Sequence, residues 1–379
     1  MKKKKILIVS NSLYGGGAEK ILQTILCNLN YDKYDITLCT FHKDIIDYRY
    51  YPRQVKYKFL FNEKKIKLLD KLNGKIFEKL PIRLFYFLNI HSIYDIEIAF
   101  IEGESTKLIS GSYNKHSKKI AWVHVDLINT PWTDVVFHSN EEEVSSYNSF
   151  DKILCVSESV KKAFLKKYTL NDPKKVSVQY NPINEVLIKK QSLENNRNYY
   201  LADNESLKLI AVGRLVEQKG FDRLLRVVKR LKNDGFKFHL LILGDGEKKN
   251  ELEKYITSNK LVDFVSLLGF KENPYFYMKQ SNLLICSSIS EGFSTVIAEG
   301  LILGLPIVST RCAGINELFG NRKCGIITEN NEDSLYEGLK KIMLNKDCIS
   351  EYAKEAYLRG LDFSLSNKIR EIEELFDNL

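Results

Sequence analysis

The sequence predicts an α/β protein of two doubly wound, Rossmann-like domains, each built on a parallel sheet. Two observations carry this prediction. The chain has 379 residues, which is too long for one ordinary core and suits two domains. The same opening also occurs twice, as an apolar run, a glycine-containing loop and an amphipathic stretch, at residues 6–29 and again at 207–231. Continuous apolar runs followed by such loops and helices are typical of buried parallel strands.

The first domain is predicted over residues 1–185. Its first strand is the apolar run 6–9, its loop contains Gly15, Gly16 and Gly17, and apolar residues recur at helical spacing from Ile21 to Leu29. Five further apolar runs predict strands, at 36–41, 96–101, 120–124, 153–156 and 176–179. The alternation of strands with amphipathic segments favours parallel pairing throughout.

The second domain is predicted over residues 207–362, after a polar linker at 186–206. Its strands are expected at 207–212, 238–243, 265–268, 283–286 and 307–309. Residues 363–379 have the apolar spacing of an amphipathic closing helix. Ligands of doubly wound sheets bind beyond the carboxyl ends of the strands, so we expect a central cleft between the two domains.

Composition excludes several classes of protein. The chain is 44% hydrophobic with only 7 Pro and 20 Gly, which argues against disorder and collagen-like repeats. No run of 18 apolar residues occurs, and the apolar run after Lys2–Lys5 is too short for a signal peptide. The 7 cysteines show no C-x-x-C pairing, as in reduced cytosolic thiols. We therefore expect a cytoplasmic chain that does not span a membrane.

The net charge of +9 is unevenly placed. Residues 1–190 hold 31 basic and 21 acidic side chains, whereas 191–379 hold 26 and 27. Within the segment 53–90, Lys67, Lys71, Lys75 and Lys79 recur every four residues, and the apolar run 84–88 follows. A basic amphipathic helix of this kind indicates peripheral association with an anionic membrane surface, here the inner face of the cell membrane. A surface helix with solvated lysines explains the pattern about equally well. Nucleic-acid binding is disfavoured because no motif for it is present.

The most informative segment runs from Glu291 to Glu299. It follows the strand predicted at 283–286, so Glu291 is expected in a loop and Ser294 and Thr295 at the start of a helix. The free amides of a helix N-terminus suit a phosphate group. Two carboxylates could then flank an elongated ligand whose phosphates lie between them. Alternatively, Glu291 caps the loop and Glu299 is solvated.

A pair of cations follows the strand predicted at 207–212. Arg214 offers a forked donor and Lys219 a point charge, which suits a diphosphate. Two positive charges can offset the charge that builds on a departing nucleoside diphosphate. Gly16 and Gly17 add backbone amides that can approach a ligand closely. Each feature alone is also consistent with an ordinary solvated loop.

Taken together, these motifs resemble the family 4 glycosyltransferases, retaining enzymes of the GT-B fold that use nucleotide-sugar donors, of the bacterial envelope and capsule polysaccharide type. The resemblance is strongest over residues 207–330, where motifs occur in the family's order. They are G-R-L-V-E-Q-K-G at 213–220, L-I-L-G-D-G-E at 241–247, V-S-L-L-G-F at 265–270, the E-x7-E segment, G-L-P-I-V-S-T at 304–310 and A-G-I-N-E at 313–317. Gly300 stands where the family more often has alanine, and the first half has no recognisable acceptor motif.

The resemblance implies a role for each candidate residue. Arg214 and Lys219 would grip the donor diphosphate, Glu299 would bind the ribose hydroxyls and Glu291 would face the transferred sugar. Amides near the glycine loop and the start of the helix would assist, and a nucleobase pocket and a histidine that touches the hexose would complete the site. The further donor-binding residues are Gly16, Gly17, Gly244, Leu268, Phe270, Phe293, Ser294 and Thr295, and the histidine is His124. The alternative for His124 is a histidine whose hydrogen bonds are satisfied within the core.

The resemblance also implies the reaction. A hexose or N-acetylhexosamine would move with retention from a nucleotide sugar, most simply UDP-linked, to a lipid-linked oligosaccharide or surface-polysaccharide precursor. Because no D-x-D triad is present, no metal or other cofactor is implied. Two alternatives stay open: a catalytically inactive GT-B partner subunit of another transferase, and a sugar-nucleotide epimerase of the same fold.

Overall fold

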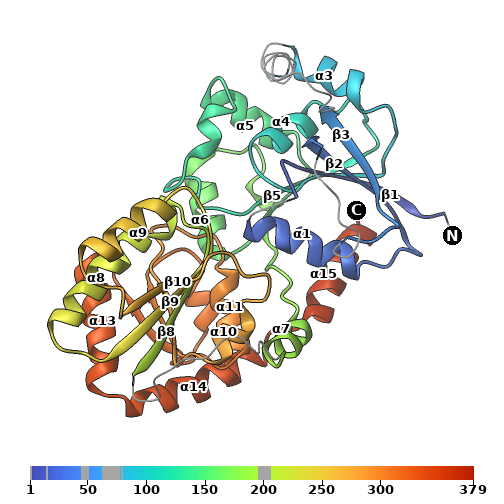
Figure 1. Cartoon of the computed structure of the whole chain (residues 1–379). Coiled ribbons are helices and arrows are strands. Elements are labelled where there is room, and N and C mark those ends of the chain that lie inside the picture. Colours follow the sequence, from blue (N-terminus) through green and yellow to red (C-terminus); the bar gives the residue numbers. More distant parts are fainter. Residues whose placement is uncertain (1, 14–15, 44–50, 62–76, 78–79, 195–205) are drawn as a thin grey trace. The chain divides into compact units, whose positions relative to one another are not determined.

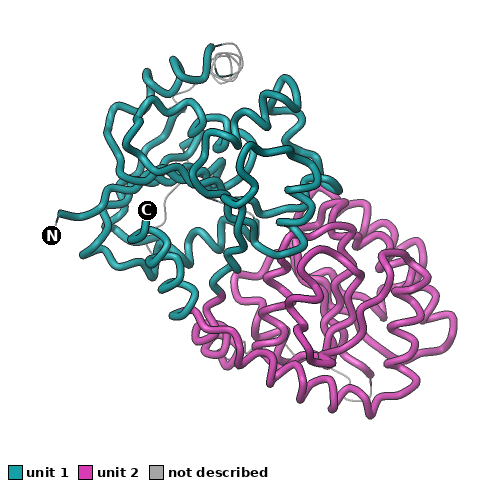
Figure 2. Tube along the Cα trace, turned by 180° about the vertical axis from the view of Figure 1, so that it is seen from behind, with its two compact units in different colours: residues 1–182, 366–379 teal, residues 183–365 magenta. Residues whose placement is uncertain are grey.

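The computed structural model describes residues 2–13, 16–43, 51–61, 77, 80–194 and 206–379 (Figure 1). The chain divides into two compact units, residues 1–182 with 366–379, and residues 183–365 (Figure 2). Each unit is a parallel sheet covered by helices, which confirms the predicted class of two Rossmann-like domains. Lys67, Lys71, Lys75 and Lys79 lie outside the described residues, as does Gly15.

The first unit contains a seven-stranded sheet in the order β3-β2-β1-β4-β5-β6-β7. Every neighbouring pair is parallel. Its strands are β1 Lys4–Ser10, β2 Tyr34–His42, β3 Lys56–Phe61, β4 Ile96–Ala99, β5 Lys118–Val123, β6 Lys152–Cys155 and β7 Val176–Val178. Its helices are α1 Gly17–Asn28, α3 Ile82–Asn89, α4 Glu104–Ser110, α5 Asn140–Asn148, α6 Glu158–Lys167 and α15 Leu365–Asp377, with single 3-10 turns at Trp132–Val135 and Pro173–Lys175.

The second unit contains a six-stranded sheet in the order β10-β9-β8-β11-β12-β13. Its strands are β8 Leu207–Val212, β9 Phe238–Leu243, β10 Val265–Leu267, β11 Leu283–Cys286, β12 Ile307–Thr310 and β13 Gly325–Thr328. Helices α8 Phe221–Asn233, α9 Lys249–Ser258 and α13 Glu332–Leu344 lie on one side of the sheet (Figure 1). The remaining helices are α7 Glu185–Ser192, α10 Tyr275–Lys279, α11 Thr295–Ile302, α12 Ile315–Phe319 and α14 Asp347–Gly360, with a 3-10 turn at Glu217–Lys219.

The core of the second unit follows from the apolar spacing of its helices. Helix α8 buries Leu224, Leu225, Val228 and Leu231 completely against β8 and β9. Helix α13 adds Leu335, Leu339 and Ile342 to the same cluster. Burial of a leucine-sized side chain contributes about 1.5–3 kcal/mol. These helices therefore fix the sheet whose loops carry the candidate site.

Two strands escape prediction from the sequence, and both lie at sheet edges. Strand β3 falls inside the basic segment, and β13 begins at Gly325. Apart from Phe61 and Thr328, their residues are exposed or half-buried, so neither strand has the continuous apolar pattern of a central parallel strand. Each adds one strand to those predicted for its sheet.

The predicted linker is wrong over residues 186–192, because these residues form helix α7 in the second unit. Asn184 caps this helix, and its side-chain oxygen accepts a hydrogen bond of 2.9 Å from the Leu187 amide. An Asn followed by an acidic first turn is a helix-start signal that outweighs the polar composition of the stretch. Residues 195–205 lie outside the described residues.

The C-terminal helix α15 packs on the first unit, although it follows the second unit in the sequence. The Phe376 ring is buried and meets Tyr34 edge to face, with 5.8 Å between ring centroids. The Tyr34 hydroxyl donates to Asp377 at 2.7 Å, and Lys33 forms an ion pair with the same carboxylate at 3.1 Å. The helix therefore closes the first unit beside β1 and β2.

We expect Phe376→Ala to destabilise the first unit by about 3–5 kcal/mol, because it removes a buried aromatic ring and leaves a cavity. Both tryptophans, Trp122 and Trp132, belong to this unit, so urea unfolding followed by tryptophan fluorescence reports on it alone. Leu88→Ala is the control, because that side chain is 52% exposed and its loss should change stability by less than about 0.5 kcal/mol. Equal midpoints for the two variants would contradict this docking.

Candidate active site

The candidate residues of the second unit gather at the carboxyl edge of its sheet. Strands β8 and β11 are neighbours at the centre of this sheet, and the strand order reverses between them. The loop after β8 carries Arg214 and Lys219, and the loop after β11 carries Glu291. A reversal of strand order in an open parallel sheet opens a crevice at the carboxyl ends, where ligands bind. The two predicted motifs therefore meet at the topological switch point.

Glycines let the loop after β8 pass close to the loop after β9. Gly244 follows β9 with φ of +149°, and a side chain there would collide with the carbonyl oxygen of Gly213. The Gly244 amide donates to the Gly269 carbonyl at 2.9 Å, which links the ends of β9 and β10. Only glycine tolerates both the backbone angle and the contact. This edge of the sheet is thus lined by backbone atoms.

Lys219 and Glu291 form an ion pair of 2.6 Å between Nζ and Oε1. The Lys219 side chain is 19% exposed and that of Glu291 is 10% exposed, so neither is freely solvated. Burial disfavours the charged ammonium, but attraction to Glu291 outweighs it, and the pKa of Lys219 is raised. The simpler interpretation was that Glu291 caps its loop. In the structure its carboxylate holds the lysine.

Arg214 differs from Lys219 in its surroundings. Its side chain is exposed, and it forms no ion pair within the part of the chain that the structure describes. Its backbone carbonyl accepts a hydrogen bond of 2.9 Å from Val216, which tightens the loop before the 3-10 turn. Lys219 is therefore a half-buried, ion-paired cation, whereas Arg214 is an exposed one.

The second loop leads into helix α11 as predicted, with Ser294 at its N-cap position. The Ser294 hydroxyl does not cap the helix. The N-terminal amides of α11 are consequently not covered by that side chain. Phe293 and Thr295 beside it are half-buried. Free amides at a helix N-terminus are suited to an anion.

Glu299 lies in the fifth position of α11 and is buried rather than solvated. Its Oε1 accepts a hydrogen bond of 3.2 Å from the Tyr275 hydroxyl of α10. The structure thus places Glu299 on the buried side of the helix that begins beside the Glu291 loop. Leu268 and Phe270 follow β10 on the same edge, where the Phe270 ring is 74% exposed. An exposed aromatic face is available for stacking.

The remaining candidates, Gly16, Gly17 and His124, belong to the first unit. Gly16 is the N-cap residue of α1 and Gly17 its first residue, so the glycine loop leads directly into a helix. The Glu19 carboxylate folds back beside Gly16, where a side chain would collide with it. These glycines therefore lie at the carboxyl edge of the first sheet, after β1.

His124 follows β5 and is buried. Its Nε2 contacts the carbonyl oxygen of Phe100 at 2.8 Å. A carbonyl only accepts hydrogen bonds, so Nε2 carries the proton, and burial lowers the pKa of His124 to about 4. The ring is accordingly neutral at physiological pH, and its Nδ1 is an acceptor. His124 is thus both a packed core residue and a potential hydrogen-bond partner.

Glu102 lies beneath His124 and was not among the predicted site residues. Its Oε2 accepts the His124 backbone amide at 3.1 Å, and the side chain is 1% exposed. Burial raises the pKa of Glu102 to about 7. The neighbouring Glu104 accepts a hydrogen bond of 2.7 Å from the Asn11 side chain, and Ser105 donates to Asn11 at 2.6 Å. Both carboxylates are thus hydrogen-bonded to other segments of the first unit.

Among the described residues, no three His, Cys, Asp or Glu side chains come together as ion ligands would. None of the helices described is long and apolar enough to cross a membrane.

The chain is similar to several known proteins. Residues 193–359 match the family model of the group 1 glycosyl transferases. A Campylobacter jejuni protein is 29% identical over 370 residues, which are 95% of each chain, and its name is N-acetylgalactosamine-N,N'-diacetylbacillosaminyl-diphospho-undecaprenol 4-alpha-N-acetylgalactosaminyltransferase. The Staphylococcus aureus capsular polysaccharide biosynthesis glycosyltransferase CapM is 23% identical over 62% of this chain and 63% of its own.

Solved structures show the same fold. The crystal structure of Anabaena Alr3699/HepE with UDP and glucose superposes with a TM-score of 0.76 at 19% identity, covering 99% of this chain and 100% of that one. The two sheets, their strand order and this likeness define a protein of the GT-B fold. The chain is a glycosyltransferase, and it is similar in sequence to bacterial envelope and capsule enzymes.

We expect the buried Glu102 to make the first unit less stable as the pH rises. An unfolded glutamate titrates near pH 4.3, whereas the pKa of Glu102 is about 7. Between these values the folded state binds the proton more tightly, so the free energy of unfolding falls with rising pH. Glu102→Gln removes this loss, by up to about 3 kcal/mol at pH 7.5, with little difference near pH 4.5.

Urea midpoints from tryptophan fluorescence at both pH values measure the difference. Glu374→Gln, which changes an exposed carboxylate on α15, is the control and should follow the wild type. A Glu102→Gln variant with the wild-type dependence on pH would show that Glu102 is ionised throughout.

Proposed function

We propose that the chain is a retaining glycosyltransferase that moves a hexose or N-acetylhexosamine from a UDP-sugar to a lipid-linked oligosaccharide or a surface-polysaccharide precursor. One observation carries the proposal. The switch point of the second unit joins a cation pair, Arg214 and Lys219, to a buried carboxylate, Glu291, on adjacent strand ends. A donor diphosphate needs such cations, and a sugar needs a fixed acceptor of hydrogen bonds.

Each residue has a distinct part in this proposal. Arg214, which is exposed, meets the diphosphate first. Lys219, whose ammonium is held in place by Glu291, supplies the second positive charge. The amides near Phe293, Ser294 and Thr295 at the start of α11 bind phosphate oxygens, while Glu299 accepts from the ribose hydroxyls. The pocket of the nucleobase is lined by Gly244, Leu268 and Phe270. The similarity to group 1 glycosyl transferases over residues 193–359 supports this assignment.

The first unit supplies the remaining groups. Neutral His124 offers Nδ1 to a sugar hydroxyl, because Nε2 is held by Phe100. Gly16 and Gly17 bring backbone amides of the first helix turn. We assign acceptor recognition to this unit, since the second unit's motifs are accounted for by the donor. The Campylobacter relative is named for a diphospho-undecaprenol acceptor, and this supports a lipid-linked acceptor here.

The chemistry requires mainly positioning and electrostatic stabilisation. As the glycosidic bond to the diphosphate breaks, negative charge grows on the leaving phosphate and positive charge on the sugar ring. Arg214 and Lys219 stabilise the former, and Glu291 stabilises the latter. The leaving phosphate accepts the proton of the acceptor hydroxyl, which enters on the same face. Because protein cations supply the charge on the phosphate side, we propose that no divalent metal is required.

We expect the purified protein to release UDP when it is given UDP-N-acetylgalactosamine, UDP-N-acetylglucosamine or UDP-glucose together with a lipid-diphosphate sugar. Arg214→Ala and Glu291→Gln should each lower kcat/KM at least about 100-fold, because each removes stabilisation of charge in the transition state. Arg226→Ala, which removes an exposed arginine of α8 paired with Glu332, is the matched control. Added EDTA should leave the rate unchanged.

The same assay separates the other possibilities. An epimerase interconverts the UDP-sugars with no acceptor present and yields no glycosylated lipid. An inactive partner subunit consumes no donor, and its pathway tolerates Glu291→Gln. Either result would overturn the transferase proposal, and loss of product on addition of EDTA would overturn metal independence.

We propose further that the enzyme works at the inner face of the cell membrane, held there through the segment 53–90. Helix α3 within this segment exposes Leu84, Phe87 and Leu88 by 43%, 55% and 52%, while Phe85 and Tyr86 on its other face are buried. An exposed apolar helix face beside basic residues suits the boundary between headgroups and acyl chains. The exposed Arg83 adds positive charge at the same helix.

We expect Phe87→Ser/Leu88→Ser to reduce sedimentation with vesicles containing phosphatidylglycerol about 10-fold or more, because two apolar side chains no longer enter the interface. Reversal of the charges at Lys67, Lys71, Lys75 and Lys79 should release the protein in the same way, and high salt should mimic it. Val186→Ser/Leu193→Ser is the control, because it replaces two exposed apolar side chains of the second unit by serine in the same way. Unchanged sedimentation of both test variants would refute the membrane assignment.

A further inference from the structure

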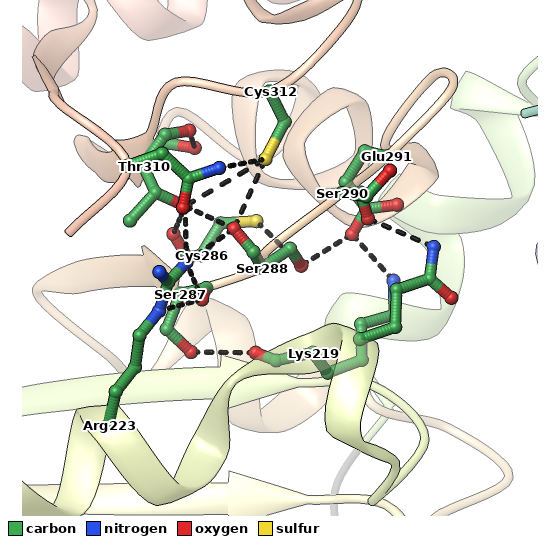
Figure 3. Close-up of polar contacts among 12 residues, drawn as sticks. Lys219, Arg223, Cys286, Ser287, Ser288, Ser290, Glu291, Thr310 and Cys312 are labelled. Carbon is green, nitrogen blue, oxygen red and sulfur yellow. Dashed lines mark hydrogen bonds and ion pairs between the residues drawn. The ribbon is translucent and has the colours of Figure 1, made fainter. Parts of the chain in front are cut away.

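The two oxygens of the Glu291 carboxylate have different surroundings. Oε1 accepts hydrogen bonds from the Lys219 ammonium and from the Ser288 hydroxyl, each at 2.6 Å (Figure 3). Oε2 has no hydrogen-bond partner within the described part of the chain. A carboxylate accepts on both oxygens, so one face of Glu291 is committed to the protein and the other is available to a ligand.

Ser288 is held by its backbone carbonyl as well as by its hydroxyl. The side chain is buried, and its carbonyl oxygen faces three donors on other elements. Arg223 Nη2 lies 2.5 Å from it, Thr310 Oγ1 lies 2.6 Å from it and Cys312 Sγ lies 3.1 Å from it. Hydrogen bonds from charged donors are the stronger ones. The backbone at Ser288 is therefore clamped from α8 and from the end of β12 (Figure 3).

The neighbouring residues are held in the same manner. Arg223 Nε donates to the Ser287 carbonyl at 2.7 Å, and the Ser287 hydroxyl donates to the Lys219 carbonyl at 2.9 Å. Gln218 donates from its side chain to the Ser290 carbonyl at 2.9 Å and accepts the Ile289 amide at 2.8 Å through its backbone. The lysine loop and the glutamate loop are thus joined at several points.

We infer that Ser288 is a positioning residue for the transfer reaction: its hydroxyl holds Oε1 of Glu291 so that Oε2 faces the sugar, and Arg223 holds Ser288 in place. This inference rests on the proposed role of Glu291. Without the serine, the carboxylate could rotate and meet Lys219 with either oxygen, which would misplace the acceptor of the sugar's hydrogen bonds. Catalytic geometry is sensitive to displacements of this size.

The proposed role predicts an effect on kcat rather than on nucleotide binding. The diphosphate contacts of Arg214 and Lys219 do not involve the Ser288 hydroxyl, so UDP alone should bind Ser288→Ala as it binds the wild type. A hydrogen bond to a charged group supports a loss of about 10–100-fold in kcat. Arg223→Gln should reproduce part of that loss, whereas Arg223→Lys, which retains a charged donor, should restore some of it.

The decisive measurement is a double-mutant cycle on UDP release with the UDP-sugar and lipid-diphosphate acceptor used above. If Ser288 acts through Glu291, the loss caused by Ser288→Ala disappears in a Glu291→Gln background. Ser309→Ala is the matched control, because this buried serine of β12 also loses one hydroxyl that donates to a carbonyl, that of Thr310 at 2.9 Å. It should retain wild-type kcat, and UDP titration calorimetry verifies that each variant is folded.

The outcomes are distinguishable. Full activity of Ser288→Ala, or equal losses in the wild-type and Glu291→Gln backgrounds, would overturn the positioning role. Full activity of Glu291→Gln would instead overturn the proposed function on which the inference rests. Loss of UDP binding by Ser288→Ala would mean that the serine supports the fold of the loop and not the orientation of one oxygen.

Discussion

The arrangement of the second unit depends on the ion pair between Lys219 and Glu291. The two residues come from loops 72 positions apart in the sequence, and they meet because β8 and β11 are adjacent parallel strands. A partly buried ammonium and a buried carboxylate are each costly to leave unpaired, so the pair fixes how closely the two loops approach. Hydrogen bonds from the Ser287 hydroxyl to the Lys219 carbonyl and from the Ile289 amide to the Gln218 carbonyl join the same two loops.

Contiguous motifs explain why much of this site was predictable. Central parallel strands are continuous apolar runs, and the residues after them are the ones that converge, so the runs at β8 and β11 pointed to Arg214, Lys219 and Glu291. Gly244 was assigned through the family resemblance instead. Edge strands β3 and β13 lack that signal because one side faces solvent. Helix α7 was obscured by the polar composition of its second half and of the residues that follow it, although its Asn cap was present in the sequence. Local patterns thus predict which residues follow the end of a strand, but they predict fewer of the residues that hold those loops in place.

The bracing residues show the limit of the sequence. Arg223 looks like one basic residue among several on an amphipathic helix, yet its side chain is 8% exposed and reaches carbonyls 64 and 65 positions away. Ser288 belongs to a run of serines in which nothing marks one member. Nothing in the sequence distinguishes Glu102 from Glu104, and burial in the folded unit is what raises the pKa of Glu102. Long-range contacts of this kind have no periodicity that a single sequence could display.

The ion pair also determines what a nucleotide sugar would encounter. The charge of Lys219 is neutralised by Glu291, whereas Arg214 is exposed and forms no ion pair among the described residues. An arriving diphosphate would therefore interact with a site whose net charge is +1, counting Arg214, Lys219 and Glu291 together. In the proposed reaction, the negative charge that grows on the leaving phosphate would be stabilised by Lys219, and the positive charge on the sugar by Glu291. Because the ion pair holds the two side chains in place, the proposed reaction would require little reorganisation of them.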